Sequence, residues 1–483
     1  MNSDKKSVLS GVFWKFAERV GAQAVSLIVS IVLARLLAPS EYGAISLVMV
    51  FITIANVFVT SGFGTALIQK KDADDIDFST VFYFSLIFTT LLYVIMFFSA
   101  EFIADFYEMS ILKPVFRVLS LSIIIMGINS VQQAYVSREM IFKKFFYATI
   151  IGTIISAVVG ITLAYHGFGV WSLVAQTLTN NVIDTIVLQL TIQWRPIKAF
   201  SLNRLKMLFT YGWKLLVQSV VLQLYSSLRS LIIGKIYTPA DLAFYTKGNQ
   251  FPDLISTNID TAINTALFPA MSKEQESIER VKVMARKTTQ VTSYVMNPIL
   301  IGFAAVAEPF ITLLLTEKWL PCVPYLRICC IALLFRAPQT AILQAIKAVG
   351  RSDSVLKVDF PIRIVALAVL LVSSRFGILY LALSEVLITV FGTALYVIMS
   401  HKIINYGARE VCADFLINTS LAMVMGIITW MVGKILPLSS IAVLPIQIVV
   451  GVIVYVFFSI ITNNTSFKYV LNTLKEIKGN LKH

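Results

Sequence analysis

The sequence predicts an all-α integral membrane protein, and three observations lead to this fold class. Hydrophobic residues make up 57% of the 483-residue chain, charged residues make up only 14%, and the mean hydropathy is +0.81. A soluble domain has about 25% charged residues, so this chain has too little charge to cover a water-facing surface. Apolar runs of about 20 residues, long enough to cross a bilayer as helices, recur along the chain. Basic residues concentrate in every second connection between these runs.

Fourteen of these runs are predicted to be transmembrane helices, joined by connections too short to form a separate soluble or catalytic domain. The first, seventh and eighth runs contain enough polar residues for hydropathy alone to rate them as weak spans. In chain order, the spans lie near residues 13–35, 42–66, 78–100, 115–136, 146–166, 169–192, 208–234, 240–268, 288–315, 322–346, 355–374, 377–400, 413–434 and 439–462.

The distribution of Lys and Arg predicts the orientation of these spans. The eight segments on one side carry 25 basic residues. The outer connections carry only six, which are Arg35, Lys113, Lys235, Lys318, Arg375 and Lys434. Because cytoplasmic loops are enriched in Lys and Arg, we expect an even number of spans with both termini in the cytoplasm and the chain in an inner membrane. The net charge of +14 then reflects anchoring to an anionic leaflet, and we expect no nucleic-acid partner.

The residues that usually carry catalysis or bind metals show no useful pattern. The four cysteines have neither a disulfide framework nor metal-ligand spacing, and the three histidines lie far apart in the chain. We therefore predict no metal site, no cofactor and no catalytic residue, and we expect a protein that is not an enzyme.

An internal repeat predicts the domain organisation. The segment 30–41, SIVLARLLAPSE, recurs as 230–241, SLIIGKIYTPAD, with serine, a basic residue, proline and an acidic residue at the same offset. Chance similarity between apolar helices is the alternative explanation. Parallel repeats are a known transporter architecture, with the substrate site between the repeats. The predicted domains are an N-terminal lobe of six helices (1–200), a C-terminal lobe of six helices (201–405), and two further helices with a cytoplasmic tail (406–483).

Two predicted spans carry stripes of basic and polar side chains. On the span 208–234, four residues fall within about 60° of arc at 100° per residue, and these are Lys214, Gln218, Tyr225 and Arg229. Lys15, Arg19, Ser26 and Ser30 do the same on the span 13–35. Since the two spans are repeat equivalents, we expect these stripes to face each other across a cation-lined cavity between the lobes.

The eighth span carries an acidic stripe that includes Asp253 and Asp260 together with Tyr245, Asn249 and Ser256. These two carboxylates either couple transport to a proton or sodium ion, or pair with Lys247 and neighbouring cations.

Other ionisable residues in the spans divide into three groups. Arg336 is a further candidate cation near the middle of its span, on the opposite side of the helix from Arg327. Asp359 and Arg363 are four residues apart and are expected to form an intrahelical ion pair. Three isolated acidic residues have no assignable role, and these are Asp184, Glu308 and Glu385.

These residues predict the parts of a transport site. An anionic headgroup, most simply a phosphate, would be bound by Lys15, Arg19, Lys214, Arg229, Lys247 and Arg336. The alternative is that the cations near helix ends extend to the membrane interface. Sugar hydroxyls would be met by Tyr211, Gln218, Tyr225 and Asn249.

Five sequence motifs resemble those of a known family. They are LARLLAPSEYG (33–43), SGFGTALIQ (61–69), LIIGK (231–235), FYTKGNQFP (244–252) and LFPAMS (267–272). With these motifs in order, the chain resembles the polysaccharide-transport branch of the multidrug/oligosaccharidyl-lipid/polysaccharide (MOP) flippase superfamily. It looks most similar to the Wzx-type lipopolysaccharide and exopolysaccharide exporters, in particular the colanic-acid exporter group.

The resemblance implies a V-shaped core of two six-helix bundles plus two extra helices, and it implies transport by alternating access. It also implies a cavity lined by spans 1, 2, 7 and 8. The substrate would be an undecaprenyl-diphosphate-linked oligosaccharide, moved from the inner to the outer leaflet for O-antigen, capsule or exopolysaccharide assembly. The expected partners are the lipid bilayer, this lipid-linked oligosaccharide and the polysaccharide polymerase machinery, and the expected oligomeric state is a monomer.

Three other functions remain alternatives. A multidrug or cation antiporter of the same superfamily would favour an acidic, aromatic cavity, whereas the stripes on spans 1 and 7 are basic. A peptidoglycan-precursor flippase is a close relative in function. A membrane glycan polymerase or ligase would need a large outer loop with catalytic residues, and the outer connections here are short.

Overall fold

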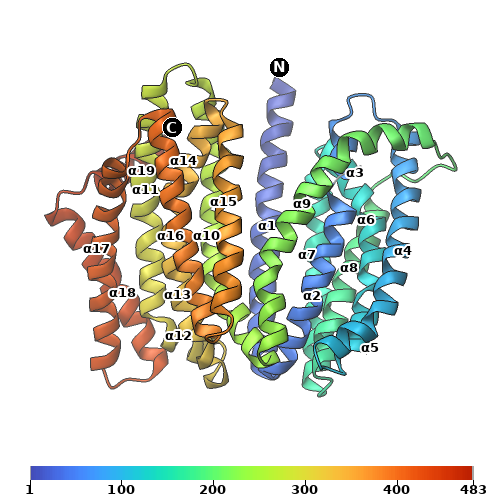
Figure 1. Ribbon diagram of the computed structural model, residues 1–483, viewed down its shortest axis with the longest axis horizontal. Coiled ribbons are helices and arrows are strands. Elements are labelled where there is room, and N and C mark those ends of the chain that lie inside the picture. The colour runs from blue at the N-terminus through green and yellow to red at the C-terminus, as the bar shows by residue number, and fades with distance from the viewer. Residues whose placement is uncertain (1, 62, 481–483) are drawn as a thin grey trace. The chain divides into compact units, whose positions relative to one another are not determined.

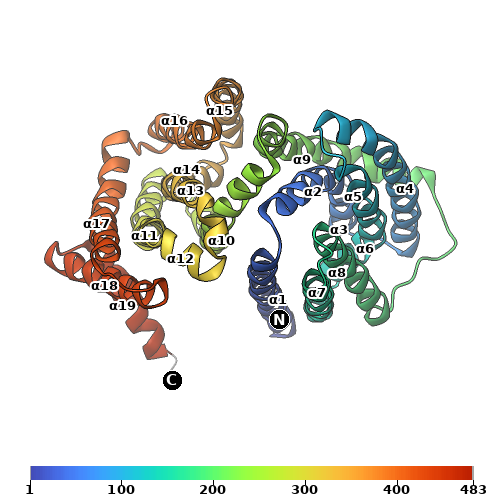
Figure 2. The same cartoon turned by 90° about the horizontal axis from the view of Figure 1, so that it is seen from below.

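The computed structural model describes residues 2–61 and 63–480, and within these residues the chain is helical and has no β-strand. The chain forms two compact units, residues 1–243 and residues 244–483. Figure 1 shows both units coloured along the chain, and Figure 2 shows the same helices turned by 90°. Each unit is described separately below.

Unit 1 is a bundle of long helices. α7 packs along both α8 and α1, and Figure 2 shows α1 beside α7. The end of α9 leads through residues 237–238 into α10, which starts at Pro239. The helices of unit 1 are α1 (Asn2–Leu36), α2 (Pro39–Thr60), α3 (Phe63–Gln69), α4 (Asp75–Phe106), α5 (Leu112–Leu119), α6 (Leu121–Arg138), α7 (Phe142–Tyr165), α8 (Val170–Thr191) and α9 (Leu202–Ile236).

Helix α4 shows the side-chain distribution of a helix that is solvated by lipid. Its large aromatic residues Phe98 and Phe102 are each 73% exposed, whereas Thr89 and Ala100 are fully buried. The close approach of α6 explains the small buried residues, because a Cβ at Gly127 would come within 2.6 Å of Oγ1 of Thr89. Small residues inside and large apolar residues outside are typical of helix packing within a membrane.

Unit 2 is a second helical bundle. Its buried cluster of apolar side chains is contributed by several helices and includes Met271, Val281, Ile346 and Val411. Helix α17 packs along α11 and α18. The helices of unit 2 are α10 (Pro239–Lys273), α11 (Ile278–Ala305), α12 (Ala307–Leu314), the 3-10 helix η1 (Glu317–Cys322), α13 (Val323–Leu334), α14 (Arg336–Ala348), α15 (Ser352–Ser373), α16 (Ile378–Ile404), α17 (Ala408–Ile435), α18 (Ser440–Ile461) and α19 (Thr465–Asn480).

The described residues contain ten helices that are long and apolar enough to cross a membrane. The count becomes eleven when α11 and α12, which are bent by 69° at their junction, are taken as one span. Three more helices, α8, α10 and α15, have at least 22 residues and so are about 33 Å or longer, but they are too polar to qualify by composition. The predicted total of fourteen therefore stays a prediction. Of the three spans expected to rate as weak, only that near 240–268 does so.

Helix α9 belongs to unit 1, because it packs against α2, α3 and α4. The internal repeat instead assigns this segment to the start of the C-terminal lobe at residue 201. The internal repeat relates segments by sequence similarity, whereas the two units are defined by which helices pack together. The predicted lobes 1–200, 201–405 and 406–483 remain a prediction.

Candidate functional site

A polar network in unit 2 joins helix α10 to α14. Asp260 is 5% exposed and forms an ion pair with Nε of Arg336. The other carboxylate oxygen of Asp260 accepts a hydrogen bond from Oγ1 of Thr340 at 3.3 Å. One turn further along α10, Oδ1 of Asn264 accepts from Nε2 of Gln344 at 2.8 Å. The contacts repeat because residues four apart lie on the same face of each helix.

The sequence assigned Asp260 to ion coupling and Arg336 to headgroup binding, and the structure brings the two side chains together. The side chain of Arg336 is 40% exposed and Asp253, two turns before Asp260, is exposed, whereas Ser256 between the two aspartates is fully buried. Asn249, the predicted sugar contact on the same face, is half-buried.

The first turns of α10 are more enclosed. The hydroxyl of Tyr245 donates to Oε2 of Glu385 at 3.3 Å. Lys247 is 6% exposed, donates to Oε1 of Gln250 at 3.1 Å and lies 6.0 Å from the ring centroid of Trp319. Of the six cations predicted to bind a headgroup, Lys247 is therefore the one most enclosed by its own unit.

The predicted cations of unit 1 lie on α1 and α9. Nζ of Lys15 is 2.9 Å from Oε2 of Glu18 and 4.4 Å from the ring centroid of Phe145 on α7. The carboxylate of Glu18 thus partly compensates the charge of Lys15. Arg19, one residue further on α1, is half-buried.

Helix α9 runs unbroken from Leu202 to Ile236, so its predicted polar residues do share one helix face. Lys214 and Gln218 are exposed, whereas Tyr225 and Arg229 are half-buried. The side chain of Tyr211 lies outside the described residues. That the stripes on α1 and α9 face each other across a cavity between lobes stays a prediction.

Three acidic residues without an assigned role have partners in the structure. Oδ2 of Asp184 accepts from Nδ2 of Asn129 at 2.9 Å, and Glu385 accepts from Tyr245 as described above. The partners of Glu308 come from two other helices and are described below. Each pair joins residues at least 19 positions apart, so spacing in the sequence could not have found them. The pair expected from spacing, Asp359 with Arg363, is confirmed at 3.8 Å.

Ion pairs also anchor the helix ends that the basic loops connect. In unit 2, Arg286 binds Asp414 through two hydrogen bonds of 2.9 and 3.1 Å, which join α11 to α17. In unit 1, Arg204 contacts Asp74, the residue that caps the N-terminus of α4. The hydrogen bond from Arg204 holds the pKa of Asp74 well below its usual range.

Within the described residues, no three His, Cys, Asp or Glu side chains gather as metal ligands. The predicted absence of a cofactor is not tested by this and stays a prediction, as does a coupling ion.

The architecture of long apolar helices with a polar network inside one bundle is that of a multi-pass membrane transporter. A family model for polysaccharide biosynthesis proteins matches residues 32–324, and the chain belongs to this family. Membership confirms the resemblance to polysaccharide transport proteins drawn from the five motifs.

Three individual proteins are similar to the chain. The succinoglycan biosynthesis transport protein ExoT of Rhizobium meliloti (strain 1021) is 23% identical over 72% of this chain and 70% of its own length. The lipopolysaccharide biosynthesis protein WzxC of Escherichia coli (strain K12) is 22% identical over 89% of each chain. Among solved structures, the lipid II flippase MurJ in an inward closed conformation has a TM-score of 0.76 at 14% identity, covering 93% of this chain and 98% of that one. The structural match shows a shared fold.

Proposed function

We propose that this protein is a flippase, which moves a polyprenyl-diphosphate-linked oligosaccharide across the bacterial inner membrane for assembly of a surface polysaccharide. The observation that carries the proposal is the polar face of α10, with Asp253 and Asp260, and its partner Arg336 of α14, in a chain of the polysaccharide biosynthesis family. Ionisable residues at membrane depth are costly and usually line a substrate or ion path. The names of ExoT and WzxC, a transport protein and a lipopolysaccharide biosynthesis protein, point the same way.

The chemistry of the substrate explains why cations are needed. A diphosphate cannot cross hydrocarbon without replacement of its hydration. Guanidinium and ammonium groups supply this replacement by charge-assisted hydrogen bonds, and Arg19, Lys214 and Arg229 are the candidates in unit 1. The sugar would contact Gln218, Tyr225 and Asn249, while the polyprenyl chain stays in lipid.

The pairing of Arg336 with Asp260 suggests how binding is coupled to an ion. While Asp260 is ionised, it holds Arg336 and competes with any anionic headgroup for it. A proton or sodium ion on Asp260 would free Arg336 to bind the headgroup. Coupling then follows from competition for one guanidinium, and alternating access would move the site from one side of the membrane to the other.

The proposal includes a topology. We infer fourteen crossings with both termini in the cytoplasm, because α8, α10 and α15 are long enough to span and the basic residues alternate between sides. The protein would act as a monomer that supplies substrate to the polysaccharide polymerase machinery.

The test is translocation of a labelled undecaprenyl-diphosphate-linked oligosaccharide in liposomes that contain the purified protein. We expect Lys214→Ala, Arg229→Ala and Arg336→Ala each to reduce the rate at least tenfold, and to cause loss of surface polysaccharide with accumulation of the precursor in cells. Lys113→Ala is the matched control, because Lys113 forms an exposed ion pair with Glu101 outside the candidate site. Normal rates in the site variants would disprove the headgroup assignment, and no transport by the wild type would disprove the flippase.

A further inference from the structure

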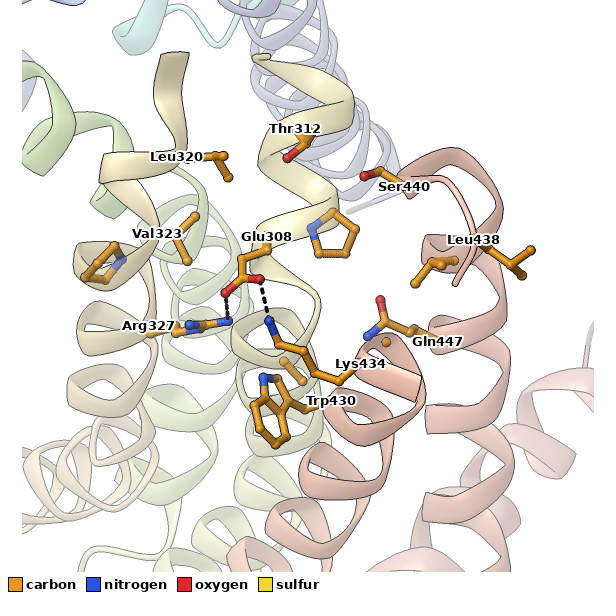
Figure 3. Close-up of a pocket in the computed structure, with 15 residues that line it drawn as sticks. Glu308, Thr312, Leu320, Val323, Arg327, Trp430, Lys434, Leu438, Ser440 and Gln447 are labelled. Atoms are coloured by element: carbon orange, nitrogen blue, oxygen red, sulfur yellow. Dashed lines mark hydrogen bonds and ion pairs between the residues drawn. The ribbon is translucent and has the colours of Figure 1, made fainter. Parts of the chain in front are cut away.

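A polar pocket in unit 2 is separate from the network between α10 and α14. It has a volume of about 530 Å³ and is lined by residues of α12, α13, α17 and α18 (Figure 3). We call it the Glu308 pocket. It lies beside η1 and the connection between α17 and α18, which the basic-residue pattern assigns to the outer side of the membrane. Its side chains that offer hydrogen bonds are Glu308, Thr312, Arg327, Lys434, Ser440 and Gln447.

The charge of the pocket is set by one acid held between two bases. The carboxylate of Glu308 lies 3.1 Å from Nη2 of Arg327 and 3.2 Å from Nζ of Lys434, as Figure 3 shows. Two cations and one carboxylate leave a single net positive charge. Such a site suits a neutral ligand or one with a single negative charge, whereas the carboxylate disfavours a phosphate dianion.

In the same pocket, the side-chain carbonyl oxygen of a buried glutamine accepts no hydrogen bond from any described residue. Gln447 is 2% exposed, and its Nε2 donates to the carbonyl oxygen of Thr429 at 2.9 Å. Among the residues that the structure describes, no group donates to Oε1 of Gln447. Leaving a buried acceptor unsatisfied is costly, so a ligand hydroxyl would complete the site.

Gly433 of α17, next to Lys434, leaves space for the side-chain amide of Gln447 because it has no side chain. A Cβ at Gly433 would come within 2.1 Å of Nε2 of Gln447. Trp430, one turn earlier in α17, also lines the pocket and is 44% exposed. The pocket thus combines a flat apolar ring with acceptors and donors of hydrogen bonds, which is the complement of a sugar ring with its apolar face and its rim of hydroxyls.

We propose that the Glu308 pocket binds a sugar unit that carries at most one acidic group. The indole of Trp430 would cover the face of the sugar ring, Glu308 and Oε1 of Gln447 would accept its hydroxyls, and Lys434 would pair with a uronic acid carboxylate. The volume lies within the range of small-molecule sites, about 300–1,000 Å³. The inference rests on the proposed function, because a flippase for lipid-linked oligosaccharide delivers sugars to this side of the membrane.

The experiment is isothermal titration calorimetry of the purified full-length protein with an aldobiouronic acid, a disaccharide with one uronic acid and one neutral sugar. A carboxyl-reduced form of the same disaccharide is the matched neutral probe. We expect saturable binding that weakens at least tenfold in Trp430→Leu and Gly433→Ala. Lys434→Met should abolish the preference for the acidic probe over the neutral one, and Lys434→Arg should keep it.

Two variants elsewhere control for nonspecific effects. Lys113→Met removes an exposed lysine of unit 1, and Trp171→Leu removes a half-buried tryptophan of α8. Both should bind the disaccharide within twofold of the wild type. The proposal is overturned by absence of saturable binding, by equal binding in all variants, or by displacement of the sugar by glycerol 3-phosphate at lower concentration, which would indicate a lipid headgroup site.

Sugar binding and translocation can be measured independently, so the proposed sugar pocket and the proposed flippase function can fail separately. The free disaccharide needs no lipid carrier, so loss of sugar binding with normal translocation in liposomes would overturn the pocket alone. Normal sugar binding without translocation would overturn the proposed function alone.

Discussion

Gly43 of α2 provides a direct test of helix packing in unit 1. A Cβ at this position would lie 1.7 Å from the carbonyl oxygen of Pro239 and 2.4 Å from its carbonyl carbon. Both residues are in unit 1, where α2 packs against α9 and Pro239 begins α10. The clash is with backbone atoms, which cannot rotate away as a flexible side chain would. We therefore predict that Gly43→Ala destabilises the protein.

The magnitude follows from two opposing effects. Two carbon atoms pack at about 3.5–4 Å, so α2 and the start of α10 must separate by about 1.5–2 Å to admit the methyl group. Overpacking typically costs about 1–3 kcal/mol, and a backbone clash belongs at the upper end. Replacing glycine by alanine within a helix gains about 1 kcal/mol. The net loss is about 2 kcal/mol, which corresponds to about 4–8 °C in melting temperature for a unit of this size.

The measurement is thermal unfolding of the purified protein in detergent, followed by size-exclusion chromatography with fluorescence detection. Gly64→Ala is the matched control, because Gly64 also lies in a helix but a Cβ there would meet no atom within 4 Å. This control should melt at the same temperature as the wild type or a few degrees higher. If Gly43→Ala is as stable as Gly64→Ala, the close crossing of α2 with Pro239 is wrong.

Two further predictions concern the ion pairs at helix ends. Arg286→Met should lower the melting temperature by several degrees more than the double variant Arg286→Met with Asp414→Leu, because the single change removes the cation that pairs with a buried carboxylate and leaves it the neutral donors Gln290 and Tyr406. An equal loss in both would argue against the pair. Arg204→Met should lower stability by a small amount at neutral pH. Since the folded-state pKa of Asp74 is depressed, the contribution of this pair is present above the unfolded pKa of about 3.8 and is lost as pH falls through the lower folded value. The difference in melting temperature between the wild type and Arg204→Met should therefore be constant above about pH 4 and shrink as the pH is lowered further, and a difference that stays constant from about pH 5 down to about pH 2 would contradict the assignment.

Part of the candidate site followed from local spacing. Because α9 is a single helix, the positions of Lys214, Gln218, Tyr225 and Arg229 at intervals of four and seven residues are enough to place them on one face. The pair of Asp359 with Arg363 was predictable for the same reason. Local periodicity determines which side chains share a face, but it does not say what that face meets.

The partners of the buried charges depended on tertiary packing. Asp260 and Arg336 were assigned to separate roles, and only the packing of α10 against α14 unites them. Glu308 had no role in the sequence and is held by Lys434, 126 residues away. Lys247 was predicted to bind a headgroup, but packing buries its side chain next to the ring of Trp319.

The sequence by itself determined that this is a helical membrane protein of the polysaccharide-transport type, because hydrophobic composition, the alternation of basic residues and short motifs are all properties of the linear chain. The tertiary structure alone decided which charges are neutralised and which stay accessible. The physical reason is that a charge within an apolar bundle is stable only with a partner or with water. Whether Asp260 meets Arg336, or Glu308 meets Lys434, is set by the register between helices that lie far apart in the sequence.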